Sequence, residues 1–276
     1  MAWLQSDIFS QSLFSSTTVN VFLPTPNSGM EPESDNKEYP ANGQKYQVLY
    51  LLHGFSANGS DWLRGSGIER YAQARRLAVV MPSCGNSFYQ NLPCGANYSD
   101  YILDELPAFV QGVFPVSSKR EHSFIAGLSM GGYGALISAL RRPQQYAAMA
   151  SLSGLLWDLA ESFSPLLFAD GNNTPHVRYI QHAFGDTLER YDRSTCDIAT
   201  MLQNAVNAKA ELPKLYQCCG TEDFLYENNT TFKAFAEKLP IDFTYEEGHG
   251  THDFDFWDPY IRKVINWLPL ADSLVG

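Results

Sequence analysis

The stretch Gly127-Leu128-Ser129-Met130-Gly131 decides how the rest of this sequence is interpreted. It follows an apolar run at residues 124–126, which predicts a buried strand, and it precedes residues 130–141, which carry apolar side chains at helical spacing. A Gly-X-Ser-X-Gly sequence at such a turn is typical of a nucleophilic serine, because the glycines let the sharp turn pack against its neighbours. The pattern alone is common by chance, so its position between strand and helix carries the prediction for Ser129.

On both sides of this turn, strands and helices are predicted to alternate along the chain. Short apolar runs bounded by turn residues predict buried strands at residues 48–52, 77–81, 147–152, 215–218 and 243–245. Helical spacing of apolar residues predicts helices at residues 98–113, 230–238 and 257–267. Residues 17–23 alternate and are rich in β-branched side chains, which predicts an antiparallel edge strand. The sequence therefore predicts an α/β fold of the α/β-hydrolase type, with a mostly parallel central sheet and helices on both faces.

The length of 276 residues fits a single α/β domain over residues 1–276. Residues 155–207 interrupt the alternation and are predicted to form a short cap-like insertion. Loops at the carboxyl ends of parallel strands line the ligand crevice of such sheets. The apolar residues of the insertion are therefore candidate walls of an acyl pocket, although each could equally pack the insertion down: Trp157, Phe163, Leu166, Leu167 and Phe168.

Composition and charge exclude several classes of function. A net charge of −11 without a basic stripe argues against binding to nucleic acid. The first residues carry no basic segment and no run is apolar enough to span a bilayer, so we expect a cytoplasmic protein without membrane association. Five cysteines without metal-ligand or disulfide spacing suit a reducing compartment. The expected chemistry requires no metal ion or organic cofactor, and the sequence leaves the oligomeric state open, a homo-oligomer included.

Two backbone N–H groups are expected to form an oxyanion hole. The first is that of Met130, at the amino end of the helix that follows Ser129. The second is that of Phe55, in the loop that follows the strand at residues 48–52. His53 in the same loop precedes the serine, whereas the order in this fold is nucleophile, acid and then histidine, so we expect His53 to shape the loop.

The acid and the base each have two candidates. Glu222 and Asp223 both follow the strand at residues 215–218, and Asp223 fits the position of the acid best. His249 and His252 both follow the strand at residues 243–245, and spacing alone does not choose between them.

Aromatic residues after another strand are candidates for contact with substrate. Phe88 and Tyr89, and Tyr98 and Tyr101 further along, could stack on a sugar or an aryl acyl group, although aromatic residues are equally common as loop packing. Trp157 of the insertion is a further candidate for contact with substrate.

Taken together, these motifs resemble the esterase D family of α/β-hydrolases, and within it the bacterial tributyrin esterase branch, which is related to carbohydrate esterases that remove acetyl or feruloyl groups. The resemblance covers nearly the whole chain. The matching segments are residues 18–24 (TVNVFLP), 50–54 (YLLHG) with Trp62, 127–134 (GLSMGGYG), 219–226 (CGTEDFLY) and 250–257 (GTHDFDFW).

This resemblance implies His252 as the catalytic histidine, Asp223 as the acid, and Phe55 and Met130 as the oxyanion donors. At position 254 this sequence has Phe254, where members of the family more usually have tryptophan. This difference affects the wall of the expected pocket and leaves the triad intact. We expect a serine carboxylesterase that hydrolyses short-chain esters of the tributyrin or acetyl type through an acyl-enzyme. The alternatives are an esterase for carbohydrate-linked acetyl or feruloyl groups, an acyltransferase, an S-formylglutathione hydrolase, and a catalytically silent binding module.

Overall fold

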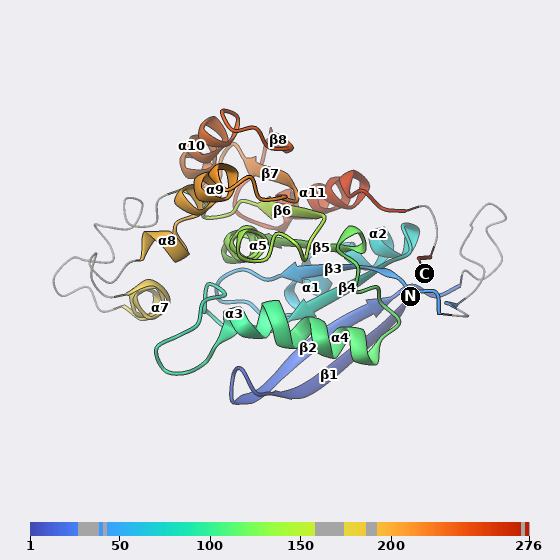
Figure 1. Ribbon diagram of the computed structural model, residues 1–276. Coiled ribbons are helices and arrows are strands. Elements are labelled where there is room, and N and C mark those ends of the chain that lie inside the picture. Colours follow the sequence, from blue (N-terminus) through green and yellow to red (C-terminus); the bar gives the residue numbers. More distant parts are fainter. Residues whose placement is uncertain (27–38, 41–42, 158–173, 186–191, 272–273, 276) are drawn as a thin grey trace.

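The strands form the centre of the molecule. The computed structural model describes all residues except 27–38, 41–42, 158–173, 186–191, 272–273 and 276 (Figure 1). The strands are β1 (Ala2–Ser10), β2 (Ser15–Leu23), β3 (Gln47–Leu52), β4 (Leu77–Pro82), β5 (Ser123–Leu128), β6 (Ala148–Leu152), β7 (Lys214–Gly220) and β8 (Phe243–Gly248). They form one sheet in the order β1-β2-β4-β3-β5-β6-β7-β8. All pairs from β4 to β8 are parallel, and β1 and β2 add an antiparallel edge.

Helices cover both faces of this sheet. The helices are α1 (Asp61–Gly65), α2 (Ile68–Ala74), α3 (Tyr98–Asp100), α4 (Leu106–Val113), α5 (Met130–Arg141), α7 (Pro175–Phe184), α8 (Arg193–Cys196), α9 (Ile198–Asn207), α10 (Tyr226–Ala236) and α11 (Phe254–Trp267). Helices α4, α5, α9 and α10 pack on one face, and α2 and α11 pack on the other. This arrangement is the predicted α/β-hydrolase fold.

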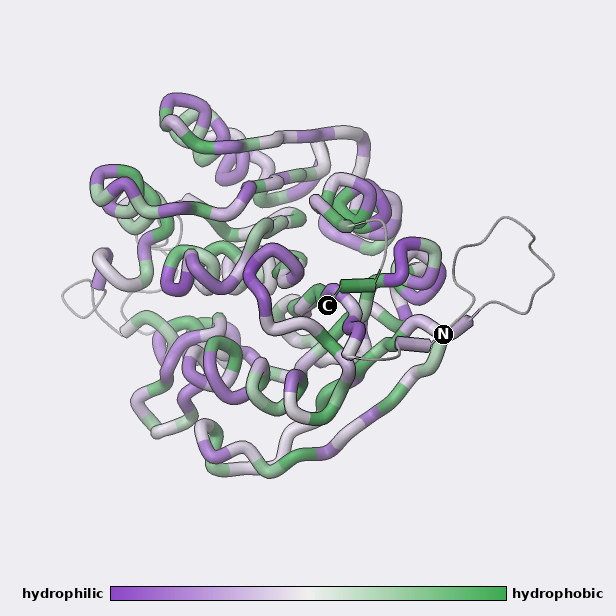
Figure 2. Tube along the Cα trace, turned by 45° about the vertical axis from the view of Figure 1, so that its right-hand side comes forward, coloured by the Kyte–Doolittle hydropathy of each residue, from purple (hydrophilic) through white to green (hydrophobic). Residues whose placement is uncertain are grey.

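Alternation along the strands explains why both faces are covered. On β3, Val48 and Tyr50 belong to the core beneath α4 and α5, whereas Leu49 and Leu51 belong to the core beneath α2 and α11. All of β3, β4 and β5 is buried, as expected for parallel strands between two helical layers. In Figure 2 hydrophobic residues are frequent in the central strands, and the outer helices carry both hydrophilic and hydrophobic residues.

Residues 17–23 are not the edge strand that the sequence predicted. They lie in β2, which pairs with β1 on one side and with β4 on the other. The missed strand β1 leaves most of its side chains exposed or only half-buried, Trp3 and Phe9 among the exposed ones. An edge strand with so little burial lacks the apolar alternation by which strands are found in a sequence.

The predicted helix at residues 98–113 is divided into three pieces. Helix α3 is followed by a π-helical turn, Tyr101–Glu105, and then by α4, which has Pro107 in its first turn. Proline has no N–H to donate to the carbonyl group four residues earlier, that of Leu103. The side-chain amide of Gln145 donates to this carbonyl oxygen at 3.1 Å, so the break in the helix leaves no buried acceptor unpaired.

The carboxyl-terminal part of the predicted insertion belongs to the helical layer of the fold. Ile198 and Leu202 of α9 pack in the same core as Leu136 of α5. Helix α8 is held to α5 by the hydroxyl group of Tyr133, which donates to the carbonyl oxygen of Cys196 at 2.8 Å. Of the apolar residues predicted to line a pocket, Phe163, Leu166, Leu167 and Phe168 lie outside the described residues.

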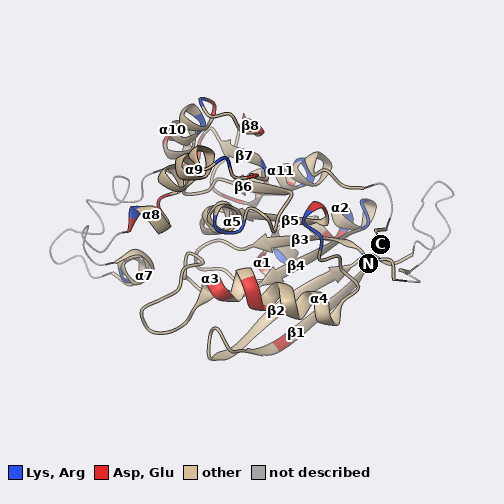
Figure 3. Cartoon of the chain, viewed as in Figure 1, with Lys and Arg blue, Asp and Glu red and all other residues tan. Residues whose placement is uncertain are grey.

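Charged side chains lie on the outside of the molecule. In Figure 3 the central strands are almost free of charge, and Lys and Arg are interspersed with Asp and Glu on the helices. None of the described helices is both long and apolar enough to cross a membrane.

Candidate active site

Ser129 lies between β5 and α5 in a backbone conformation that few residues adopt. Its φ of 53° and ψ of −119° place a non-glycine residue at positive φ, which costs on the order of 1–3 kcal/mol. The N–H of Ser129 donates to the carbonyl oxygen of Leu152 at 2.9 Å, and its own carbonyl oxygen accepts from Tyr133 N–H at 3.1 Å. Neighbouring strand and helix therefore hold the strained residue in place.

The two glycines of the motif permit this turn through close backbone contacts. A Cβ atom on Gly127 would lie 2.3 Å from the carbonyl oxygen of Gly131. A Cβ atom on Gly131 would lie 2.4 Å from the carbonyl oxygen of Leu52, at the end of β3. Because both contacts are with backbone, no side chain can move aside to relieve them. The spacing of the motif thus reflects the packing of β3, β5 and α5.

Ser129, His252 and Asp223 form a continuous chain of hydrogen bonds. His252 Nε2 lies 2.9 Å from Ser129 Oγ, and His252 Nδ1 lies 2.8 Å from Asp223 Oδ2. The carboxylate can only accept, so the proton lies on Nδ1 and Nε2 accepts from the serine hydroxyl group. The side chain of Asp223 is fully buried and that of His252 is 17% exposed. This arrangement can move a proton from the hydroxyl group to the imidazole and stabilise the imidazolium.

The competing candidates form a second acid–histidine pair on the surface. Glu222 Oε1 lies 2.7 Å from His249 Nδ1, and the side chain of His249 is 95% exposed. Glu222 Oε2 also accepts from the N–H of Gly250 at 2.7 Å, while the Glu222 N–H donates to the Gly250 carbonyl oxygen at 3.1 Å. Glu222 therefore ties the loop that carries Asp223 to the loop that carries His252, and it has no contact with Ser129.

The two predicted oxyanion donors come from the segments that adjoin Ser129. A Cβ atom on Gly54 would lie 3.5 Å from Ser129 Cβ, so the backbone that leads to Phe55 passes beside the serine. Met130 is the first residue of α5, where backbone N–H groups have no partner within the helix. In the described part of the chain, no hydrogen-bond acceptor is paired with the N–H of Phe55 or of Met130. Both donors are available to a negatively charged oxygen.

His53 is buried beneath this loop. Its Nδ1 atom lies 2.8 Å from the carbonyl oxygen of Gly54, and its Nε2 atom accepts from the N–H of Cys84 at 2.9 Å. Both ring nitrogens are thus used in joining the end of β3 to the end of β4. Burial lowers the pKa of His53 and outweighs the opposing effect of the hydrogen bond to Gly54, so the ring is held neutral. This geometry agrees with a structural role for His53.

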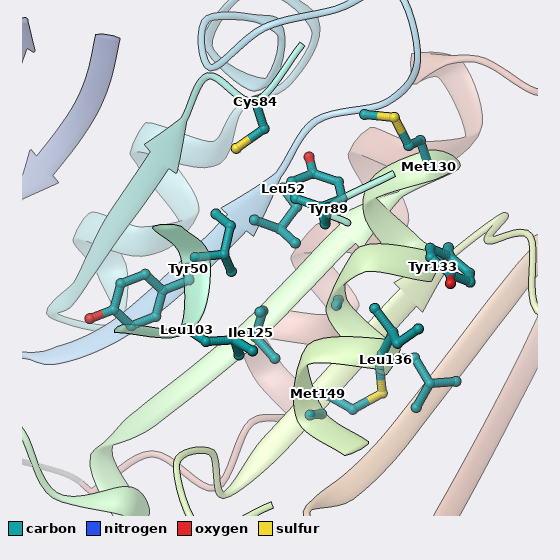
Figure 4. Packing of buried hydrophobic residues seen from close by; sticks show 14 of the residues in the cluster. Tyr50, Leu52, Cys84, Tyr89, Leu103, Ile125, Met130, Tyr133, Leu136 and Met149 are labelled. Atoms are coloured by element: carbon teal, nitrogen blue, oxygen red, sulfur yellow. The ribbon is translucent and has the colours of Figure 1, made fainter. Parts of the chain in front are cut away.

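Phe88 and Tyr89 are buried. Both have positive φ, and their exposed fractions are 5% and 1%. The Tyr89 hydroxyl group donates to the carbonyl oxygen of His53 at 2.8 Å, and the ring packs against Gly134. Figure 4 shows Tyr89 among the buried hydrophobic side chains of the core. Tyr89 has no free surface on which a ligand could stack, so its predicted contact with substrate is not supported by this structure. Phe88 packs edge-on against Tyr133 and Phe184.

Helix α7 lies against the loop that carries Phe55. The ring of Phe55 lies 4.8 Å from that of His176 and 6.0 Å from that of Tyr179. Trp157 contacts other residues: its ring is edge-on to Phe235 of α10, and its backbone N–H donates to Asn228 Oδ1 at 3.1 Å. Its predicted contact with substrate remains a prediction.

Two aromatic residues that contact the His252 ring escaped the sequence analysis as functional residues. The buried indole of Trp257 lies edge-on at 4.9 Å and donates its N–H to Ser153 Oγ at 3.1 Å. The ring of Phe224 lies at 4.4 Å and is 75% exposed. Phe224 directly follows the predicted acid Asp223 in the sequence, and this adjacency was the feature that could have marked Phe224 as a residue near the site.

Comparisons with known proteins agree with this fold and identify the family. The Esterase family model matches residues 10–260. An acetyl esterase of Caldicellulosiruptor saccharolyticus is 33% identical over 269 residues, which cover 97% of this chain and 98% of the relative.

Two solved structures from Staphylococcus aureus are similar to this chain, and each comparison covers 97% of this chain and 98% of the other. FphF, a fluorophosphonate-binding serine hydrolase, is 30% identical with a TM-score of 0.81. The S-formylglutathione hydrolase FrmB is 31% identical with a TM-score of 0.80. A ferulic acid esterase at 22% identity and a TM-score of 0.74 shares the fold. The chain belongs to the Esterase family of α/β-hydrolases, of the esterase D type, and it is a serine esterase.

Proposed function

We propose that this esterase hydrolyses short-chain acyl esters through a Ser129–His252–Asp223 triad and an acyl-enzyme intermediate. The observation that carries the proposal is the 2.9 Å contact between His252 Nε2 and Ser129 Oγ, at a histidine whose other nitrogen binds the buried carboxylate of Asp223. The three side chains thus have the arrangement that a nucleophile, a base and an orienting acid require.

Each half of the reaction uses the same three side chains. Ser129 Oγ attacks the ester carbonyl carbon while His252 Nε2 takes the hydroxyl proton, and the N–H groups of Phe55 and Met130 bind the oxyanion. His252 then returns the proton to the departing alcohol oxygen, which leaves the acyl group on Ser129. A water molecule next gives its proton to His252 and attacks the acyl-enzyme, and proton return to Ser129 releases the acid.

A preference for short acyl groups is supported by the relatives. The 33% identical relative is named an acetyl esterase, and the 31% identical structure is named an S-formylglutathione hydrolase. These names refer to acyl groups of two carbons and one carbon. Both comparisons cover 97% of this chain. We place the acetyl esterase first because its identity of 33% is higher than the 31% of the S-formylglutathione hydrolase.

The described cysteines support a reducing compartment, which we propose is the cytoplasm. All five are free thiols, and four of them are buried: Cys84, Cys196, Cys218 and Cys219. Immunodetection of the protein in separated cell fractions tests this placement, and recovery outside the cytoplasmic fraction contradicts it.

The proposed reaction is tested with 4-nitrophenyl esters and the Ser129→Ala variant. We expect acetate and butyrate to react with higher kcat/KM than octanoate. Ser129→Ala should lose at least about 10³-fold in kcat and all labelling by a fluorophosphonate probe, since the nucleophile is gone. A folded Ser129→Ala variant that keeps most of the activity would refute the triad. Parallel assays with methyl ferulate and S-formylglutathione show whether another acyl group is preferred to acetyl.

A further inference from the structure

Phe224 exposes a large apolar ring directly beside the proposed base. Its exposed fraction is 75%, and its ring centroid lies 4.4 Å from that of His252, with 48° between the two planes. Phe224 immediately follows the buried Asp223, so the acid anchors the backbone on which the ring is presented. Exposed apolar side chains are common on protein surfaces, so it is the contact of this ring with the proposed base, and not its exposure alone, that points to a role in the reaction.

The other sides of the His252 imidazole are occupied. Nδ1 binds Asp223, Nε2 faces Ser129 Oγ, and the buried indole of Trp257 lies edge-on at 4.9 Å. Trp257 is itself fixed, because its indole N–H donates to the buried Ser153. Of these neighbours of the imidazole, Phe224 is the one that is largely exposed to solvent.

Proton transfer places the leaving alcohol at this same position. When the acyl-enzyme forms, the departing oxygen takes its proton from His252 Nε2 and must lie about 3 Å from it. The rest of the alcohol has to extend toward solvent, since Trp257 and Asp223 fill the buried sides. Because the ring of Phe224 lies 4.4 Å from that of His252 and is largely exposed, an alcohol that extends into solvent from this point can lie against it. The acyl group, by contrast, is bonded to Ser129 at that stage and points away from the departing oxygen.

We infer that Phe224 is the contact surface for the leaving alcohol and favours alcohols that carry an aryl or pyranose ring, an inference that rests on the proposed function. Aryl groups stack on such a ring, and the C–H face of a pyranose offers the same apolar contact. Stacking of this kind raises kcat/KM by about three- to tenfold. Phe224 thus determines specificity for the alcohol and leaves the choice of acyl group to other residues.

The test holds the acyl group constant and varies the alcohol. Phe224→Ala and Phe224→Trp are compared with the natural protein on phenyl acetate, an acetylated methyl xylopyranoside and ethyl acetate. For Phe224→Ala we expect kcat/KM to fall about three- to tenfold on at least one ring-bearing ester and less than about twofold on ethyl acetate. Phe224→Trp should retain the preference. Loss on phenyl acetate alone identifies aryl alcohols as the favoured class, and loss on the xyloside alone identifies sugars.

A second measurement separates contact with the alcohol from support of His252. Deacylation is followed as the steady rate after the burst on 4-nitrophenyl acetate, when the alcohol has already left, and Phe224→Ala should leave this rate unchanged. An equal loss on all three esters together with slower deacylation would mean that the ring merely steadies the imidazole. That result, or no change on any ester, overturns the inference while the triad stands. Activity retained in Ser129→Ala would instead remove the proposed function itself.

Discussion

The carboxylate of Glu222 lies 2.7 Å from Nδ1 of the exposed His249, while the very next residue, Asp223, turns inward to His252. Two acid–histidine pairs thus arise from the same two loops, and one of them reaches Ser129. The hydrogen bond from Gly250 N–H, and then the one from His249, lower the pKa of Glu222 to about 2. At neutral pH Glu222 is therefore ionised, and its carboxylate can accept the hydrogen bond from Gly250 N–H that joins the two loops.

Substitution of each acid by its amide distinguishes the two pairs. We expect Asp223→Asn to lower kcat on 4-nitrophenyl acetate by about 10³- to 10⁴-fold, because the amide no longer favours the required tautomer or stabilises the imidazolium. Glu222→Gln should lose less than about tenfold, since its amide oxygen can still accept from Gly250 N–H. Comparable losses in the two variants, measured on proteins with unchanged circular dichroism, would contradict the assignment of Asp223.

Two glycine-to-alanine changes should affect stability in opposite directions. Gly131→Ala places a Cβ atom 2.4 Å from the Leu52 carbonyl oxygen and should cost about 3 kcal/mol or more. Gly112 lies in the exposed part of α4 with no atom within 4 Å of its added Cβ, so Gly112→Ala should stabilise by about 0.5–1 kcal/mol. Urea unfolding of both variants checks this contrast. A neutral Gly131→Ala would show that the turn has more room than the structure indicates.

Glu105 should make stability depend on acid pH. Its carboxylate accepts from Ser10 Oγ at 2.7 Å and from the N–H groups of Gln11 and Ser12 at 2.8 and 2.9 Å. Burial raises the pKa of Glu105, but these hydrogen bonds outweigh burial and leave it below its usual value. A lowered folded-state pKa contributes stability above the unfolded-state value of 4.5, and this contribution is lost as the pH falls below it.

Glu105→Gln measures that contribution. At pH 7 the variant should be less stable by about 1–3 kcal/mol, because a charge-assisted acceptor for the turn between β1 and β2 is lost. Thermal unfolding between pH 7 and pH 3 should show the two proteins converging toward the acid end. A difference that stays constant across this range would exclude the titration of Glu105 as its cause.

His53→Ala should impair both folding and catalysis. Removal of the ring leaves the buried N–H of Cys84 and the carbonyl oxygen of Gly54 without their partners, at a cost of about 2–3 kcal/mol. The loop that presents the Phe55 N–H would lose its support, so kcat should fall about tenfold or more in the protein that remains folded. His122→Ala, at a half-buried histidine far from this loop in sequence, is the control and should keep kcat. If His53→Ala keeps full kcat, the loop does not depend on this ring.

Local sequence patterns were sufficient to predict several parts of the fold and of the site. Buried parallel strands are continuous apolar runs, so β3, β4 and β6 were found close to their observed bounds. The turn at Ser129 is recognisable because backbone contacts at Gly127 and Gly131 exclude every larger residue. The family resemblance then selected His252 over His249, a choice that spacing had left open.

Other features depend on contacts between segments that are distant in the sequence, and they could be assigned only from the folded chain. Asp223 and Glu222 are neighbours in sequence, and the loop of residues 248–253 determines which carboxylate is buried against His252 and which faces solvent. The aromatic side chain of Tyr89 is of a type on which a ligand could stack. In the fold, however, Tyr89 is buried between the end of β3 and α5. Strand β1 is defined by its pairing with β2 and not by any apolar periodicity of its own. Burial and orientation arise from packing across the whole chain, and a local pattern of residue types does not contain them.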